Sequence, residues 1–469
     1  MAPIAIPSMK RYHFITPILA CCILTFAACE ADSPRPEAPA VPDNTGITPI
    51  SKNNRVIYEV NVRNYAPSGD FAGVEQGIPR LKELGVDILW LMPIHPIGEV
   101  NRAGSLGSPY AVKDYRAVNP EFGTPADLKS LIAAAHAANM EVWLDWVSNH
   151  TAWDHHWVSQ HLDFYAERNG QRPYSPEGWN DVAQLDFNNP AMRSAMIDAM
   201  KYWVQEFDID GYRCDAVMFV PLDFWREARQ QVDAVKPITW LAEGDDPRYM
   251  EVFDVDYAWA FNTALNEFGA HRDVSRLVAE CHKLVGNPNY AQRTRMVYLT
   301  NHDLSAFEGT EFARYGNNVM PLSVLYFTVY DMPLIYNGQE IGLNKAVSLF
   351  DRDPLPWEPA NVRYTNLFKR LTRLKRTQPA LTGGEGRAPI SRYSTNHDDK
   401  VLVYSRTQGD NEVLVMLNLA NNPVRFRFTA ASPAGPFEDY LQGGTAQFST
   451  ADYLTLPANG YAIYVKNLQ

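Results

Sequence analysis

The stretch Asp208-Ile209-Asp210-Gly211-Tyr212-Arg213-Cys214-Asp215-Ala216 ends a short β-like run with an arginine and a carboxylate close together. Successive side chains of a strand alternate between its two faces, so Arg213 and Asp215 are expected to point to the same side. A cation beside a carboxylate favours the ionised form, which a nucleophile needs near neutral pH. Buried arginine–aspartate pairs are also common as structural ion pairs, so this stretch alone leaves both interpretations open.

Short apolar runs alternate with longer helix-period segments from Val56 onward, a pattern typical of βα units around a parallel sheet. We expect eight strands, at 56–60, 86–91, 141–147, 211–215, 239–243, 255–259, 296–301 and 333–336. We expect helices between them, including 74–84, 126–138, 191–207 and 274–284. The sequence therefore predicts an α/β fold, a (β/α)8 TIM barrel over residues 55–383.

Two segments depart from this repeat. Residues 151–184, after the third expected strand, show no clear period and contain Trp153, Trp157 and Trp179. We expect a short loop subdomain there, because long loops at this end of a barrel usually carry function. Residues 384–469 alternate as short strands do, which predicts a C-terminal antiparallel β-sandwich domain.

The N-terminal region has the features of an export signal. Lys10 and Arg11 precede an apolar run, 14–28, that is short for a membrane span and ends in small residues before Cys29. We interpret residues 1–28 as a lipoprotein signal peptide, Cys29 as the lipidated residue and the proline-rich segment 29–54 as a tether. The protein is thus expected to be exported and anchored to a membrane as a lipoprotein, in the outer membrane, at the cell surface or in the periplasm.

The composition excludes some classes of partner. The formal net charge is -12 and no basic block follows the extreme N-terminus, so nucleic acid is not an expected partner. Only Cys214 and Cys281 lie outside the signal and anchor, so no disulfide framework is expected. No feature of the sequence indicates a particular oligomeric state.

Acidic and polar residues gather where the expected strands end. In chain order they are Asp145, Asn149 and His150 after the third strand, Arg213 and Asp215 on the fourth, Glu243 on the fifth, and Asn301, His302 and Asp303 on the seventh. In a barrel these ends lie on one rim, so we expect one pocket. Carboxylates with histidines and an arginine suit acid–base chemistry on a polar neutral substrate, and glycoside hydrolysis is the obvious class. No metal-hydrolase motif is present.

Four short segments carry a more specific pattern: 145–150 (Asp-Trp-Val-Ser-Asn-His), 211–216 (Gly-Tyr-Arg-Cys-Asp-Ala), 240–243 (Trp-Leu-Ala-Glu) and 300–303 (Thr-Asn-His-Asp). In order and spacing they resemble the signature segments of the α-amylase family, glycoside hydrolase family 13. The supporting segments 91–94, 184–188 and 333–340 are similar as well, and the resemblance covers residues 55–469. It implies a retaining hydrolase of α-1,4-glucosidic bonds in starch or malto-oligosaccharides that forms a covalent glycosyl-enzyme intermediate.

The resemblance assigns the catalytic roles residue by residue. Asp215 matches the nucleophile, Glu243 the general acid/base, and Asp303 the third carboxylate, which binds sugar hydroxyls and helps to distort the ring. We expect burial near the other two carboxylates to raise the pKa of Glu243, while Arg213 keeps Asp215 ionised.

The resemblance also implies residues that bind the substrate and a cation. Arg213 matches the arginine beside the nucleophile; His150 and His302 match histidines that contact sugar hydroxyls, and Tyr110 resembles the aromatic platform under the ring. Asn149 matches a calcium ligand of many members, with Asp181 as a candidate second ligand from the long loop. The alternative for Asn149 is a hydrogen-bonding role beside His150.

The cues to linkage point in different directions. Ala216 resembles members that cut α-1,4 bonds, whereas 184–188 (Gln-Leu-Asp-Phe-Asn) is closer to oligosaccharide α-glucosidases. Met218 and Phe219 stand where typical α-amylases carry a Lys-His pair. Alternatives are therefore an oligosaccharide α-glucosidase or transglycosylase of the same family, or, in a different class, a non-catalytic glycan-binding lipoprotein.

Overall fold

The structure is a computed structural model that describes residues 38–286 and 293–468. The expected signal peptide, 1–28, and the expected lipidation site Cys29 lie outside the described residues. Within these ranges, no helix combines the length and the apolar character that a membrane crossing requires.

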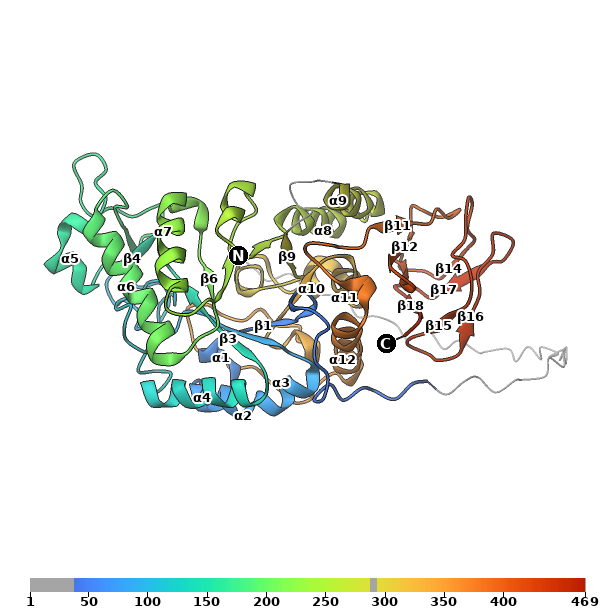
Figure 1. Cartoon of the computed structure of the whole chain (residues 1–469), viewed down its shortest axis with the longest axis horizontal. Helices are drawn as coiled ribbons and strands as arrows, with labels where there is room; N and C mark the ends of the chain where they lie inside the picture. The colour runs from blue at the N-terminus through green and yellow to red at the C-terminus, as the bar shows by residue number, and fades with distance from the viewer. Residues whose placement is uncertain (1–37, 287–292, 469) are drawn as a thin grey trace, which may run out of the picture. The chain divides into compact units, whose positions relative to one another are not determined.

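A closed parallel barrel confirms the fold class predicted from the sequence (Figure 1). In order around the barrel its strands are β1 (Ile57–Val60), β10 (Met332–Tyr336), β9 (Thr294–Val297), β8 (Val255–Tyr257), β7 (Thr239–Ala242), β6 (Gly211–Cys214), β3 (Glu141–Trp146) and β2 (Ile88–Leu91). Each overlaps one of the eight predicted strands, because strands covered on both faces read as short, nearly continuous apolar runs.

Large side chains fill the inside of the barrel. Trp90, Trp143, Leu241 and Met296 pack there as one buried cluster. The barrel is therefore a packed core and not a pore, so ligands are expected at its rim.

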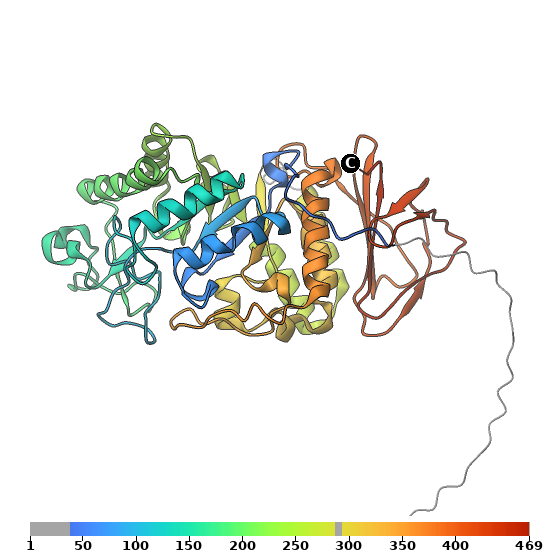
Figure 2. The same ribbon diagram turned by 90° about the horizontal axis from the view of Figure 1, so that it is seen from below.

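Helices surround the barrel (Figures 1 and 2). They are α1 (Val62–Tyr65), α2 (Phe71–Gln76), α3 (Ile78–Leu84), α4 (Pro125–Ala137), α6 (Pro190–Phe207), α7 (Leu222–Asp233), α8 (Trp259–His271), α9 (Val274–Gly286), α10 (Glu311–Tyr315), α11 (Val319–Val329) and α12 (Val362–Thr377). The single helix predicted at 74–84 is wrong, since the chain breaks at Gly77 between α2 and α3. Pro79, which has no backbone N–H to continue the ladder, explains the break.

Two further parts are attached to the barrel. The segment after β3 forms a small subdomain with the hairpin β4 (His150–Ala152) and β5 (Val182–Gln184) and the short helix α5 (His156–Gln160). Beyond α12, the antiparallel strands are β11 (Ile390–Arg392), β12 (Val401–Gln408), β13 (Asn411–Asn418), β14 (Val424–Phe426), β15 (Phe437–Asp439), β16 (Thr445–Ala446), β17 (Leu454–Leu456) and β18 (Tyr461–Lys466). Thr328 of α11 and Tyr404 of β12 are hydrogen-bonded at 2.6 Å, which joins the barrel to this domain.

The segment predicted as a free tether, 29–54, is packed in its second half. Asn44 is fully buried, and its amide donates to the carbonyl oxygens of Leu84 and Lys369 at 3.1 and 3.0 Å. Asn54 is also buried and donates to Lys375 O at 2.8 Å. The prediction is therefore wrong from about Asn44 onward, because these amides satisfy carbonyl groups at the ends and sides of helices.

Candidate active site

The rim at the carboxyl ends of the barrel strands holds an open pocket of about 350 Å³. The segments that follow strands β6, β7 and β9 contribute to its lining, together with other loops. The predicted site residues that line it are Tyr110, His150, Asp181, Asp215, Glu243, His302 and Asp303. Residues from distant parts of the sequence therefore meet at one rim, as the barrel prediction required.

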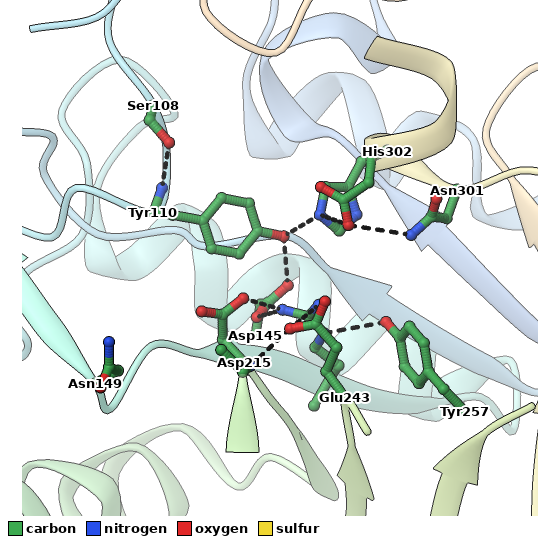
Figure 3. A network of polar contacts seen from close by, with 12 residues as sticks. Ser108, Tyr110, Asp145, Asn149, Asp215, Glu243, Tyr257, Asn301 and His302 are labelled. Carbon is green, nitrogen blue, oxygen red and sulfur yellow. Dashed lines mark hydrogen bonds and ion pairs between the residues drawn. The ribbon is translucent and has the colours of Figure 1, made fainter. Parts of the chain in front are cut away.

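Arg213 organises the carboxylates of this pocket. Its fully buried guanidinium donates from Nη1 to Asp145 Oδ1 at 2.8 Å and to Asp215 Oδ1 at 2.7 Å, and Nη2 lies 3.0 Å from Glu243 Oε2. Figure 3 shows Asp145, Asp215 and Glu243 gathered around one centre. Arg213 and Asp215 share a face, as predicted, and the arginine binds carboxylates from three neighbouring strands.

Glu243 is the carboxyl group that holds a proton most firmly here. Burial, together with the charges of Asp215 and Asp303, outweighs the Arg213 guanidinium and raises the pKa of Glu243 to about 8. The backbone N–H of Ala216 also donates to Glu243 Oε2 at 2.6 Å, from a left-handed conformation with φ 44° that is uncommon outside glycine. The predicted direction of the pKa shift is confirmed, and Glu243 is mostly protonated at neutral pH.

His302 is held between two carboxylates. Its Nδ1 contacts Glu59 Oε1 at 2.5 Å, and its Nε2 lies 3.3 Å from Asp303 Oδ2. Burial disfavours the imidazolium, but Asp303 and Glu59 outweigh it and raise the pKa of His302 well above its ordinary value. Burial likewise disfavours the Asp303 carboxylate, but His302 outweighs it and lowers the pKa of Asp303 to about 2. At neutral pH the pair is therefore a cation beside an anion.

Tyr110 lies where an aromatic platform would be needed. Its ring stacks on that of His302, with centroids 5.2 Å apart and an angle of 20° (Figure 3). The hydroxyl donates to Asp145 Oδ2 at 3.0 Å and lies 2.7 Å from His302 Nε2. These contacts fix the ring at one side of the pocket, with His150 also in the lining.

The sequence prediction missed two residues of this network and did not assign a third to the site. Glu59 is fully buried in β1, and Tyr257 accepts a hydrogen bond from Arg213 Nε at 3.1 Å. Asp145 was recognised at a strand end but was given no role. A glutamate inside the apolar run 56–60 could have indicated that Glu59 belongs to the site. Tyr257, by contrast, resembles an ordinary core residue in the sequence.

The residues present do not fit a calcium ion at the expected place. Asn149 lies apart from the carboxylate network (Figure 3), and both its carbonyl oxygens accept hydrogen bonds from the Gln184 amide. Asp181, the other expected ligand, instead lines the open pocket beside His150. Throughout residues 38–286 and 293–468, no group of three or more His, Cys, Asp or Glu side chains suits a metal ion. The calcium expectation is therefore not supported, and Asn149 has its alternative, hydrogen-bonding role.

Comparison with known proteins places these features in context. The family model described as "Alpha amylase, catalytic domain" matches residues 42–182 and 168–361. The chain is 27% identical over 423 residues to the α-amylase MalA of Haloarcula japonica. This match covers 86% of the chain but only 60% of that relative's length.

Solved structures are similar over nearly their whole length. An α-amylase from Lactobacillus plantarum has a TM-score of 0.78 and 33% identity, covering 88% of this chain and 99% of that one. The maltogenic α-amylase AmyB from Thermotoga neapolitana has a TM-score of 0.80 and 27% identity, covering 89% and 100%. The similarity thus extends through the barrel and the C-terminal domain.

Proposed function

Because the chain belongs to the α-amylase family, we propose that it hydrolyses α-1,4-glucosidic bonds of starch or malto-oligosaccharides with retention of configuration. The observation that carries the proposal is the shared guanidinium of Arg213, which contacts Asp215 at 2.7 Å and Glu243 at 3.0 Å. A retaining pair requires carboxyl groups about 5 to 5.5 Å apart, closer than the pair of an inverting enzyme. Two carboxylates on one guanidinium suit the closer arrangement.

In the first step, Asp215 attacks the anomeric carbon of the sugar. A bond forms between a carboxylate oxygen and this carbon, the glycosidic C–O bond breaks, and Glu243 gives its proton to the departing oxygen. The pKa of about 8 keeps that proton on Glu243 at neutral pH. The guanidinium of Arg213 donates a hydrogen bond to Asp215 at 2.7 Å and so holds the attacking carboxyl group in place.

In the second step, water breaks the covalent intermediate. The Glu243 carboxylate takes a proton from water, the hydroxide oxygen bonds to the anomeric carbon, and Asp215 leaves as a carboxylate. Asp303, His302 and His150 bind sugar hydroxyls from the pocket lining. The ring of Tyr110 packs under the sugar.

Three apolar side chains in the pocket lining, Trp179, Met218 and Phe219, favour a second outcome of the reaction. Met218 and Phe219 are 39% and 44% exposed, and Trp179 lies beside Phe219 with ring centroids 5.9 Å apart. Apolar faces of this kind stack on sugars, so an acceptor sugar could replace water in the second step. Transglycosylation is therefore the alternative. Trp179→Ala should lower the ratio of transfer to hydrolysis products from maltotriose, and an unchanged ratio would exclude this role.

The decisive experiment uses the purified protein with maltoheptaose, pullulan and isomaltose. Cleavage of maltoheptaose with initial release of the α-anomer, seen by proton NMR, is the expected result. Release of the β-anomer would refute retention, and cleavage of isomaltose alone would refute the α-1,4 assignment. Asp215→Asn should abolish turnover while oligosaccharide binding remains, and absence of turnover in the wild type would indicate a glycan-binding protein.

We further propose that the protein is an exported, membrane-anchored lipoprotein. The support is the signal-like segment 1–28 followed by Cys29. Labelled palmitate should be incorporated into the wild type and not into Cys29→Ser. Labelling of both proteins, or of neither, would refute the proposal.

A further inference from the structure

The side-chain amide of Gln184 lies at a point where carbonyl oxygens converge. Its Nε2 donates to Asn149 Oδ1 at 2.9 Å, to Asn149 O at 3.0 Å and to Leu185 O at 3.2 Å. An amide group has only two hydrogens for these three acceptors. Carbonyl oxygens directed at one point form the kind of environment in which proteins also bind Ca²⁺.

This point connects the barrel to the inserted subdomain. Asn149 follows β3 and is 1% exposed, whereas Gln184 is the last residue of β5. The hairpin pairs His150 with Gln184, and Asn149 Nδ2 lies 3.2 Å from His150 Nδ1. The amide therefore holds the loop that carries His150 into the pocket.

We propose that the Gln184 amide takes the place of a divalent cation, so that this link needs no metal. A calcium site requires six to eight oxygen ligands and usually carboxylates to balance the charge. The two carbonyl oxygens of Asn149 are already engaged by a neutral donor. Asp181, the expected carboxylate, lines the pocket beside His150 instead.

Gln184→Glu tests this idea with an almost isosteric change. The variant removes the donor and directs a carboxylate at the same carbonyl oxygens, so repulsion between oxygens loosens the link unless a cation enters. We expect its Tm to fall in EGTA and to rise with added Ca²⁺ in a concentration-dependent way. The Tm of the wild type should respond to neither reagent. Gln171→Glu, an exposed change in the same subdomain, is the matched control and should behave as the wild type.

The outcomes separate clearly, and none of them depends on the proposed enzymatic activity. A wild-type Tm that falls in EGTA, together with bound calcium that Asn149→Ala removes, would overturn the proposal. So would a Gln184→Glu variant that is destabilised but indifferent to Ca²⁺. Recovery of folded Gln184→Glu only when Ca²⁺ is present during refolding would support it. If this variant folds under neither condition, the calcium content and EGTA response of the wild type decide.

Discussion

Replacement of Glu243 by glutamine is expected to remove activity and, at alkaline pH, to stabilise the protein. The pKa of Glu243 is raised from 4.5 to about 8, chiefly by burial. Below the pKa that the group has in the unfolded chain, 4.5, the carboxyl group is neutral in both the folded and the unfolded protein and contributes no pH dependence to stability. As the pH rises toward 8, the unfolded chain ionises while the folded chain keeps the proton. Wild-type stability therefore falls by about 1.4 kcal/mol per pH unit over this range and no further above it.

The full shift from 4.5 to about 8 corresponds to at most about 5 kcal/mol of unfolding free energy. Glutamine cannot ionise and so avoids this cost. The guanidinium of Arg213 keeps Asp145 and Asp215 as partners in the variant. We expect the free energy of unfolding of Glu243→Gln, relative to that of the wild type, to rise by about 2 to 5 kcal/mol between acid and alkaline pH.

Urea unfolding near pH 5, 7 and 9, followed by tryptophan fluorescence, measures this difference. Glu177→Gln, an exposed change, is the control and should not alter the pH dependence. The activity of Glu243→Gln should fall by about 100- to 10,000-fold, and wild-type activity should fall above about pH 8. A stability difference between variant and wild type that does not change with pH would refute the reasoning.

Two further predictions concern Glu59 and Gly77. Glu59→Gln removes a charge beside His302 but keeps a hydrogen-bond acceptor, so the pKa of His302 should fall. The loss of activity at alkaline pH should then begin at a lower pH than in the wild type. An unchanged titration of His302 by NMR would contradict this. A Cβ on Gly77 would lie 2.0 Å from Tyr65 Oη, so Gly77→Ala should cost about 1 to 3 kcal/mol of unfolding free energy, whereas Gly46→Ala, with no atom within 4 Å, should be near neutral. Equal urea midpoints for the two alanine variants would argue against that steric account.

The barrel and its rim were predictable because they depend on local patterns. Strands such as β2 are short apolar runs, and parallel topology alone brings the residues at their carboxyl ends together. That rule was sufficient to place Asp215, Glu243 and Asp303 in one pocket.

Contacts between distant polar side chains were not predictable in this way. Asn44 lies in a proline-rich stretch that reads as a linker, yet its amide bonds to Lys369 O, which is 325 residues away. Gln184 reads as part of a family-like segment, and only the folded hairpin shows its amide beside Asn149. Such hydrogen bonds depend on the direction of the side chain and on partners that are distant in the sequence. The local hydrophobic pattern does not indicate where those partners lie.

The charges at the rim explain why one particular carboxyl group becomes the acid. Five carboxylates surround two cations, the carboxylates being Glu59, Asp145, Asp215, Glu243 and Asp303 and the cations Arg213 and protonated His302. Full ionisation would leave an excess of negative charge in a poorly solvated site, which favours the protonated form of a carboxyl group. Asp303 is excluded because His302 lowers its pKa to about 2, and burial raises the pKa of Asp145 only to about 6. Glu243, at about 8, is the group that remains protonated at neutral pH. On this reasoning, the proton that the leaving group needs is a consequence of burying Glu243 among more carboxylates than cations, beside the side chain that the stretch 208–216 contributes, Arg213.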